Sequence, residues 1–183
     1  GTANWGSLTK LTALNLGENP LDDRTLEVLA NLPELRHLHL ENVHLAGEAF
    51  TRPGAFAALE ELKIGSDRLT PDAWLAISRL PKLKLLSVQG KGSVPLWEKQ
   101  AVGFANLTAY YCDGSSMTPA DWNAISQLPA LRELRVIRAG NLDEAITHWE
   151  SSLPIESLVL QECQLSRESF LRLVERTPVL TNL

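Results

Sequence analysis

Apolar residues recur along this chain in a fixed order that repeats every 24 residues. The first copy, 11–21, reads LTALNLGENPL and fits the pattern LxxLxLxxNxL. Six more copies follow at the same spacing, and a shortened eighth begins at Leu180, one residue out of step. A constant period of this length predicts stacked copies of one structural unit, none of which could bury its apolar side alone.

Each copy combines two kinds of segment. The apolar pair two residues apart predicts a short strand that turns those side chains inward and the intervening residues outward. The connection 69–81 predicts a helix of about two turns, because Thr70 suits the N-cap, Pro71 the first turn and Pro81 the end. Three other segments fit this template: 22–32, 117–129 and 166–174. Trp74, Trp122 and Trp149 fall on apolar positions of the helical connections between strands, where they are expected to pack in the core.

Some connections depart from the pattern. In the third copy, the segment 51–54, which contains Pro53 and Gly54, interrupts the helix and predicts a shorter or irregular connection there. The segment 91–95 replaces the expected asparagine and outer leucine, which predicts a looser loop. The asparagine of the pattern is kept only at Asn19, so no continuous asparagine ladder is expected.

The repeated LxxLxLxxNxL pattern resembles the leucine-rich-repeat family over essentially all of residues 8–183. The resemblance implies an α/β solenoid with a curved parallel sheet on the concave side and short helices on the convex side. It predicts a single domain over 1–183, with about seven full repeats and a truncated eighth. We expect this domain to be part of a larger protein. The period and the Thr-Pro helix starts are similar to bacterial repeats, including recognition segments of secreted effectors.

Composition and charge limit the kinds of partner and the cellular compartment that can be expected. A net charge of −5 gives no reason to expect a nucleic acid, which needs clustered Lys and Arg. No apolar run approaches the roughly 18–20 residues that span a bilayer, so no membrane partner is expected either. Cys112 and Cys163 fall on different repeats, which predicts buried, unbridged thiols. Together with the lack of a signal segment, these thiols favour the cytoplasm or a host cytosol, although the sequence does not fix the compartment.

The alternation of the strands assigns outward residues to three columns on the concave face, where solenoids usually bind. The first column contains Ala13, His37, Glu61, Leu85, Ala109, Glu133 and Ser157. The central column contains Asn15, His39, Lys63, Ser87, Tyr111, Arg135 and Val159. The third column contains Gly17, Glu41, Gly65, Gln89, Asp113, Ile137 and Gln161.

These columns predict a partner-binding face. Tyr111, Arg135 and Ile137 lie on adjacent strands and have the aromatic, arginine and apolar character of an interface centre. Leu85 and Val159 extend its apolar part. A charged rim is expected from Glu61, Lys63, Asp113 and Glu133, and the remaining predicted contacts are His37, His39, Ser87 and Gln89. Single exposed apolar residues are common on protein surfaces, so ordinary surface exposure remains an alternative interpretation.

The pair His37 and His39 offers a second interpretation. Two imidazoles at i and i+2 of a strand share a face, and Glu61 on the next strand could complete a metal site. A surface pair of histidines beside acids is the simpler alternative. No glycine-rich phosphate loop and no nucleophile-base-acid trio is found, so the sequence predicts neither a cofactor nor an enzyme. Any catalytic activity would belong to a domain outside this segment.

Three hypotheses of function follow. The first is a recognition module that binds another protein with its concave face, as the resemblance implies. The second is an intramolecular scaffold or autoinhibitory domain that packs on another domain of the same chain. The third is a metal site at the His-x-His strand.

Overall fold

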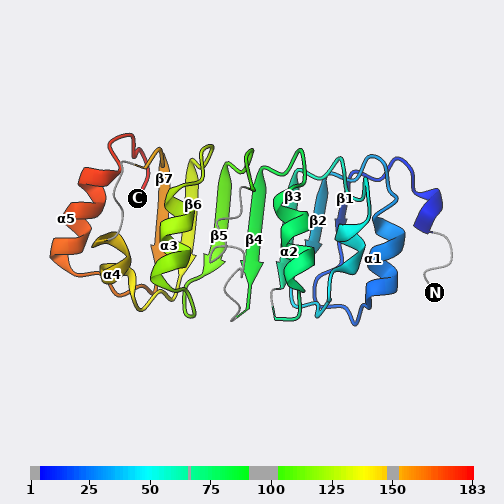
Figure 1. Cartoon of the computed structure of the whole chain (residues 1–183), viewed down its shortest axis with the longest axis horizontal. Helices are drawn as coiled ribbons and strands as arrows, with labels where there is room; N and C mark the ends of the chain where they lie inside the picture. Colours follow the sequence, from blue (N-terminus) through cyan, green and yellow to red (C-terminus); the bar gives the residue numbers. More distant parts are fainter. Residues whose placement is uncertain (1–4, 66, 91–102, 148–152) are drawn as a thin grey trace.

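A computed structural model of the chain describes residues 5–65, 67–90, 103–147 and 153–183. Its strands form one parallel sheet in which neighbours in sequence are neighbours in space (Figure 1). The strands are β1 (Ala13–Asn15), β2 (His37–Leu40), β3 (Glu61–Gly65), β4 (Leu85–Gln89), β5 (Ala109–Asp113), β6 (Glu133–Ile137) and β7 (Ser157–Gln161). The expected loop at 91–95 and the expected core position of Trp149 lie outside the described residues.

The register of the sheet repeats the period of the sequence. His37 pairs with Glu61, Glu61 with Leu85 and Ala109 with Glu133, each a step of 24 residues. Inward leucines such as Leu38 and Leu62 are completely buried. The predicted parallel sheet is therefore confirmed, and the constant period is what places equivalent side chains in continuous columns.

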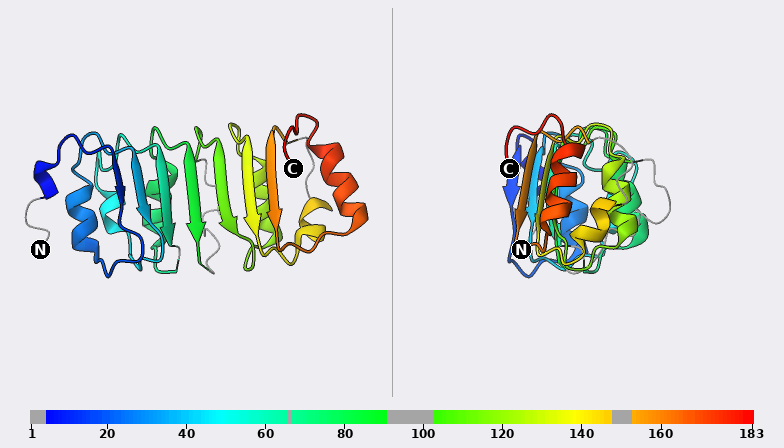
Figure 2. Two further views of the ribbon diagram at one scale, coloured as in Figure 1. Left: turned by 180° about the vertical axis from the view of Figure 1, so that it is seen from behind. Right: turned by 90° about the vertical axis from the view of Figure 1, so that its left-hand side faces the viewer.

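Helical segments cover one face of the sheet and leave the other face bare (Figure 2). They are η1 (Trp5–Ser7), α1 (Asp23–Leu29), η2 (Glu48–Thr51), α2 (Pro71–Ser78), α3 (Pro119–Ser126), α4 (Leu142–Thr147) and α5 (Arg167–Arg176). The predicted N-caps are confirmed, because the hydroxyls of Thr70 and Thr118 accept hydrogen bonds from Ala73 N and Asp121 N. Trp74 and Trp122 are 1% and 0% exposed, as the helix template predicts.

The irregular connection predicted near Pro53 is confirmed as the short 3-10 helix η2. It starts at Gly47, whose φ of 79° lies in the left-handed region. A Cβ at this position would lie 2.5 Å from Leu69 Cδ2 and 3.0 Å from Ala73 Cβ, so any other residue would need both this strained backbone and a shift of the buried Leu69 side chain. The single pattern asparagine has a local role, since the Asn19 amide donates to the carbonyls of Leu16 and Gly17.

The cysteines match the prediction only in part. Both thiols are unbridged, and Cys112 is buried, but Cys163 is only half-buried. The expectation of two buried thiols is therefore wrong for Cys163, although Val43 and Ala139, at the equivalent position of earlier repeats, are buried.

The shortened eighth copy starts a further strand. Thr181 N and Asn182 N both donate to Glu156 O, as the equivalent amides of earlier repeats do, and Ser157 pairs with Asn182 in parallel. This pairing is a step of 25 residues, which agrees with the shift by one residue seen in the sequence. Within the described residues, no helix has the length and apolar character needed to cross a membrane.

One side chain ties the first two helical connections together. The Asp23 carboxylate accepts hydrogen bonds from Ala46 N at 3.0 Å and from the buried Gly47 N at 2.7 Å. We expect Asp23→Ala to lower the free energy of unfolding by about 2 kcal/mol, because it leaves these amides without an acceptor. Urea unfolding followed by circular dichroism measures the loss. The matched control is Asp72→Ala, an exposed acid on α2, and an equal effect of both changes would contradict the role of Asp23.

Candidate functional site

The bare side of the sheet, here called the strand face, carries every residue predicted to bind a partner. These residues were predicted from the alternation of side chains along the strands, and the structure shows that alternation. Inward residues are buried and outward residues are half-buried, as in Glu61–Gly65 and Leu85–Gln89. Arg135 is the most exposed of the predicted residues, and the others are half-buried. The strand face is thus a shallow surface of mixed polar and apolar side chains.

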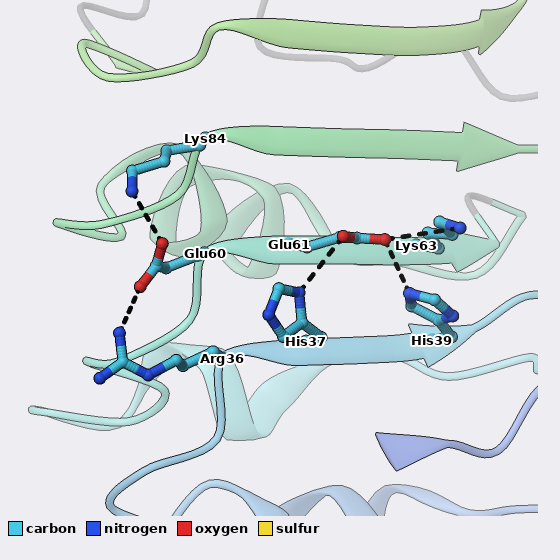
Figure 3. A network of polar contacts seen from close by, with 7 residues as sticks. All are labelled: Arg36, His37, His39, Glu60, Glu61, Lys63 and Lys84. Atoms are coloured by element: carbon cyan, nitrogen blue, oxygen red, sulfur yellow. Dashed lines mark hydrogen bonds and ion pairs between the residues drawn. The ribbon is translucent and has the colours of Figure 1, made fainter. Parts of the chain in front are cut away.

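The first cluster on this face is centred on Glu61 (Figure 3). One carboxylate oxygen lies 2.8 Å from His39 Nε2 and 3.4 Å from Lys63 Nζ, and the other lies 3.3 Å from His37 Nδ1. Burial acts to raise the pKa of the Glu61 carboxyl, but the hydrogen bonds from His39 and His37 and the charge of Lys63 outweigh it and hold the pKa below its ordinary value.

This arrangement is a hydrogen-bonded cluster and not a metal centre. The ring nitrogens of His37 and His39 that face Glu61 meet opposite oxygens of its carboxylate, so the three side chains bind one another instead of converging on a common point. Over the described ranges, no three His, Cys, Asp or Glu side chains are grouped so that they could hold a metal ion. The metal site predicted from the His-x-His spacing is therefore wrong for these residues.

The lowered pKa of Glu61 predicts a pH effect. A carboxyl whose pKa is lower in the folded state adds stability above its unfolded value, near 4.5, and this stability is lost as the pH falls through the folded value. We expect Glu61→Gln to destabilise the protein at pH 7 and to cost progressively less below pH about 4.5. Urea unfolding at a series of pH values checks this. Glu34→Gln, an exposed acid with no bonded partner among the described residues, should show no such trend, and a trend equal to that of Glu61→Gln would contradict the assignment.

A short ladder of ion pairs runs beside this cluster at the starts of the strands. Glu60 accepts from Arg36 Nη1 at 2.6 Å and from Lys84 Nζ at 2.8 Å, which links three successive repeats (Figure 3). Arg36 and Lys84 are largely exposed, so these pairs contribute little stability. Together the three side chains leave one net positive charge at the edge of the face.

The second cluster lies on β5 and β6. The Tyr111 hydroxyl donates to Glu133 Oε1 at 2.8 Å, and Arg135 Cζ lies 5.0 Å from the centre of the Tyr111 ring. Burial and the hydrogen bond to Glu133 raise the pKa of Tyr111 to about 12, so the phenol is neutral at physiological pH. Tyr111 is therefore a fixed aromatic platform beneath a guanidinium, a combination that is typical of interface centres.

The strand face also has an open groove of about 700 Å³, which includes Tyr111 and Arg135 of the second cluster. It brings together these predicted residues: Lys63, Ser87, Gln89, Tyr111, Asp113, Arg135 and Ile137. The others, which do not line the groove, are His37, His39, Glu61, Leu85, Glu133 and Val159. The groove therefore runs along the central and third columns, toward the ends of the strands.

The groove also contains residues that the sequence did not predict as contacts. Asn42 and Arg138 line it from the position that follows the third column, where both have left-handed φ values, 57° and 59°. The Arg138 guanidinium pairs with the Asp113 carboxylate, which also accepts from Ser115 N at 3.0 Å. Asn42 and Arg138 occupy the same position of the 24-residue repeat, and this was the sign in the sequence that they lie on the same face.

Glu41 is a further lining residue that the sequence did not single out. Its carboxylate accepts from Gln89 Nε2 at 3.4 Å, although β2 and β4 are separated by β3. The strand between them has Gly65 at the equivalent position, so no side chain stands in the way. The glycine thus allows one interaction to extend across three strands of the groove.

The parallel strands, their 24-residue register and the helices on one face define the class: an α/β leucine-rich-repeat solenoid. No family model and no curated protein matches the sequence. A solved structure, an internalin (inlF) from Listeria monocytogenes str. 4b F2365, is similar in fold, with 18% identity and a TM-score of 0.50. The match covers 97% of this chain and 55% of the internalin chain, so this chain spans about half the length of that structure. At this identity the likeness shows the fold.

Proposed function

We propose that this chain is a recognition module that binds another protein through the groove on its strand face. The observation that carries the proposal is the Tyr111–Arg135 stack, an aromatic platform and a guanidinium held ready in the groove. Tyr and Arg are the residue types that most often dominate binding energy at protein interfaces, together with Trp. The half-buried Ile137 adds apolar surface next to the stack.

Several features of the surface support this proposal. The groove is open and shallow, which suits a protein segment better than an enclosed small molecule. Charges of both signs surround its centre, as in the polar rim of an interface. The period and the Thr-Pro helix starts are similar to bacterial repeats, and the internalin is a bacterial protein of this fold. We therefore propose a bacterial recognition segment that forms part of a secreted effector.

Site-specific photo-crosslinking tests the proposal. A benzoylphenylalanine at Ser87 or Ile137, on the strand face, should capture the same partner in an extract of the source cells or their host. The same group at Asp72 or Asn123, exposed on the helical face, should not. Equal capture from both faces, or capture from the helical face alone, would contradict strand-face recognition.

A second candidate function rests on the apolar end of the solenoid. Apart from Leu8, the exposed large apolar side chains of the described residues gather in α5 and the segment after it: Phe170, Leu171, Val174, Val179 and Leu183. Such a patch favours contact with another surface. The alternative function is thus an intramolecular scaffold or autoinhibitory domain whose end packs on another part of the same polypeptide.

Substitution of the patch separates this candidate from the first. In the full polypeptide, Leu171→Asp with Val174→Asp should release any neighbouring domain and raise its activity. Unchanged activity, with photo-crosslinking at the strand face intact, would contradict the scaffold function and leave the recognition function standing.

A further inference from the structure

Arg135 differs from Lys63 and Arg138, the other cations of the strand face, in the contacts that it makes among the described residues. Lys63 pairs with Glu61, and Arg138 pairs with Asp113. In the part of the chain that the structure describes, the Arg135 guanidinium makes no ion pair or hydrogen bond, and its contact is the Tyr111 ring. Its five N–H donors are therefore available to a ligand.

The guanidinium nevertheless has one contact that orients it, the Tyr111 ring. The Tyr111 ring beneath it is itself fixed by the hydrogen bond to Glu133, at 2.8 Å. Glu133 lies on the same strand as Arg135, but it accepts from the tyrosine and lies beyond ion-pair distance of the arginine. Because less side-chain entropy is lost when a pre-positioned arginine binds, this residue is suited to capture an anion.

The surroundings indicate the chemistry of that anion. Ile137 on the same strand and Val159, which pairs with Arg135 in the register of β6 and β7, are half-buried apolar neighbours. Glu41 lines the groove and Glu133 lies beside it, and neither has an ion-pair partner among the described residues. Both would repel a doubly charged phosphate more than a single carboxylate. A carboxylate also matches the planar guanidinium with two parallel hydrogen bonds.

We infer that Arg135 receives the carboxylate of an aspartate or glutamate of the partner protein, and that an adjacent apolar side chain of the partner covers Ile137 and Val159. The inference rests on the proposed function and makes it specific: the partner segment carries an acidic residue next to an apolar one. Arg135 acts as the charge-recognition residue, and Tyr111 positions it.

Nuclear magnetic resonance titration with defined peptides tests the inference. Three capped pentapeptides are used, with leucines around a central glutamate, glutamine or phosphoserine. The glutamate peptide should shift the Arg135 Nε–H resonance in a saturable way, together with the Ile137 methyl resonances. The glutamine peptide should bind about tenfold more weakly, because it cannot form the charge-assisted pair.

Variants of the protein provide the controls. Arg135→Gln should abolish the preference for glutamate, and Arg135→Lys should reduce it, because lysine lacks the planar pair of donors. Arg36→Gln, which removes a cation that is paired with Glu60 and does not line the groove, should leave the preference unchanged. Circular dichroism confirms that each variant is folded.

Each other outcome overturns the inference in a distinguishable way. Equal shifts with glutamate and glutamine peptides would remove the acidic preference while keeping strand-face recognition. Tighter binding of the phosphoserine peptide would replace a carboxylate partner by a phosphorylated one. No shift at Arg135 with any peptide would reject anion capture there, and the crosslinking experiment then decides the proposed function separately.

Discussion

Replacing Trp122 by alanine is expected to lower the free energy of unfolding by about 3–5 kcal/mol. The side chain is completely buried between α3 and the sheet, so its removal leaves a large cavity. It also breaks a link between repeats, because the indole Nε1 donates to Asn141 Oδ1 at 3.2 Å and the Asn141 amide donates to Met117 O at 2.6 Å. Since domains are stable by only about 5–15 kcal/mol, the loss would be a large part of the total.

Urea unfolding followed by far-ultraviolet circular dichroism measures this effect. Trp5→Ala is the matched control, since the same atoms are removed from a half-buried tryptophan at the first repeat, and it should cost clearly less. A Trp122→Ala variant as stable as Trp5→Ala would contradict the packing described. In a solenoid each repeat contacts only its neighbours, so the variant should also unfold less cooperatively, with a lower m value.

The fold was predictable because a constant 24-residue period requires equivalent residues of every copy to take equivalent positions. Once Leu38 and Leu62 are assigned inward, the same assignment follows for every copy, and the sheet must be parallel and in register. What the sequence template missed was local. The helix α4 lacks the Thr-Pro start and was not among the predicted segments. The irregular connection near Pro53 was predicted, but not its 3-10 conformation, which follows a left-handed Gly47 packed against Leu69. Both are set by contacts between repeats, which a single copy does not reveal.

The face of the sheet that carries the site was predictable from the alternation of side chains along the strands. The hydrogen bonds and ion pairs between these side chains were not predictable. Strand geometry places Tyr111 and Arg135 side by side, whereas the side-chain torsions decide that Tyr111 bonds Glu133 and that Arg135 stays unpaired. The same torsions turn His37 and His39 toward opposite oxygens of Glu61 instead of a metal. Arg138 was missed because the direction of its side chain depends on a left-handed backbone conformation. Glycine is the usual sign of that conformation in a sequence, and this position has an arginine instead.

Removal of the aromatic platform should have the largest effect on binding. We expect Tyr111→Ala to weaken binding of the crosslinked partner at least about thirtyfold, the loss that defines a binding hot spot. Two contributions disappear together: the ring that a partner side chain would cover and the surface on which the Arg135 guanidinium stacks. Isothermal titration calorimetry with the purified partner measures the affinity.

Tyr111→Phe separates the ring from its hydroxyl. It keeps the platform and loses the bond to Glu133, which leaves that carboxylate able to approach Arg135 on the same strand. We therefore expect an intermediate loss of affinity, greater at low ionic strength, where a Glu133–Arg135 pair would compete most with the partner. His39→Gln, in the cluster outside the groove, should change the affinity less than about threefold, because changes away from an interface centre cost little. If His39→Gln costs as much as Tyr111→Ala, the binding centre lies over the first strands, and the assignment of the groove is wrong.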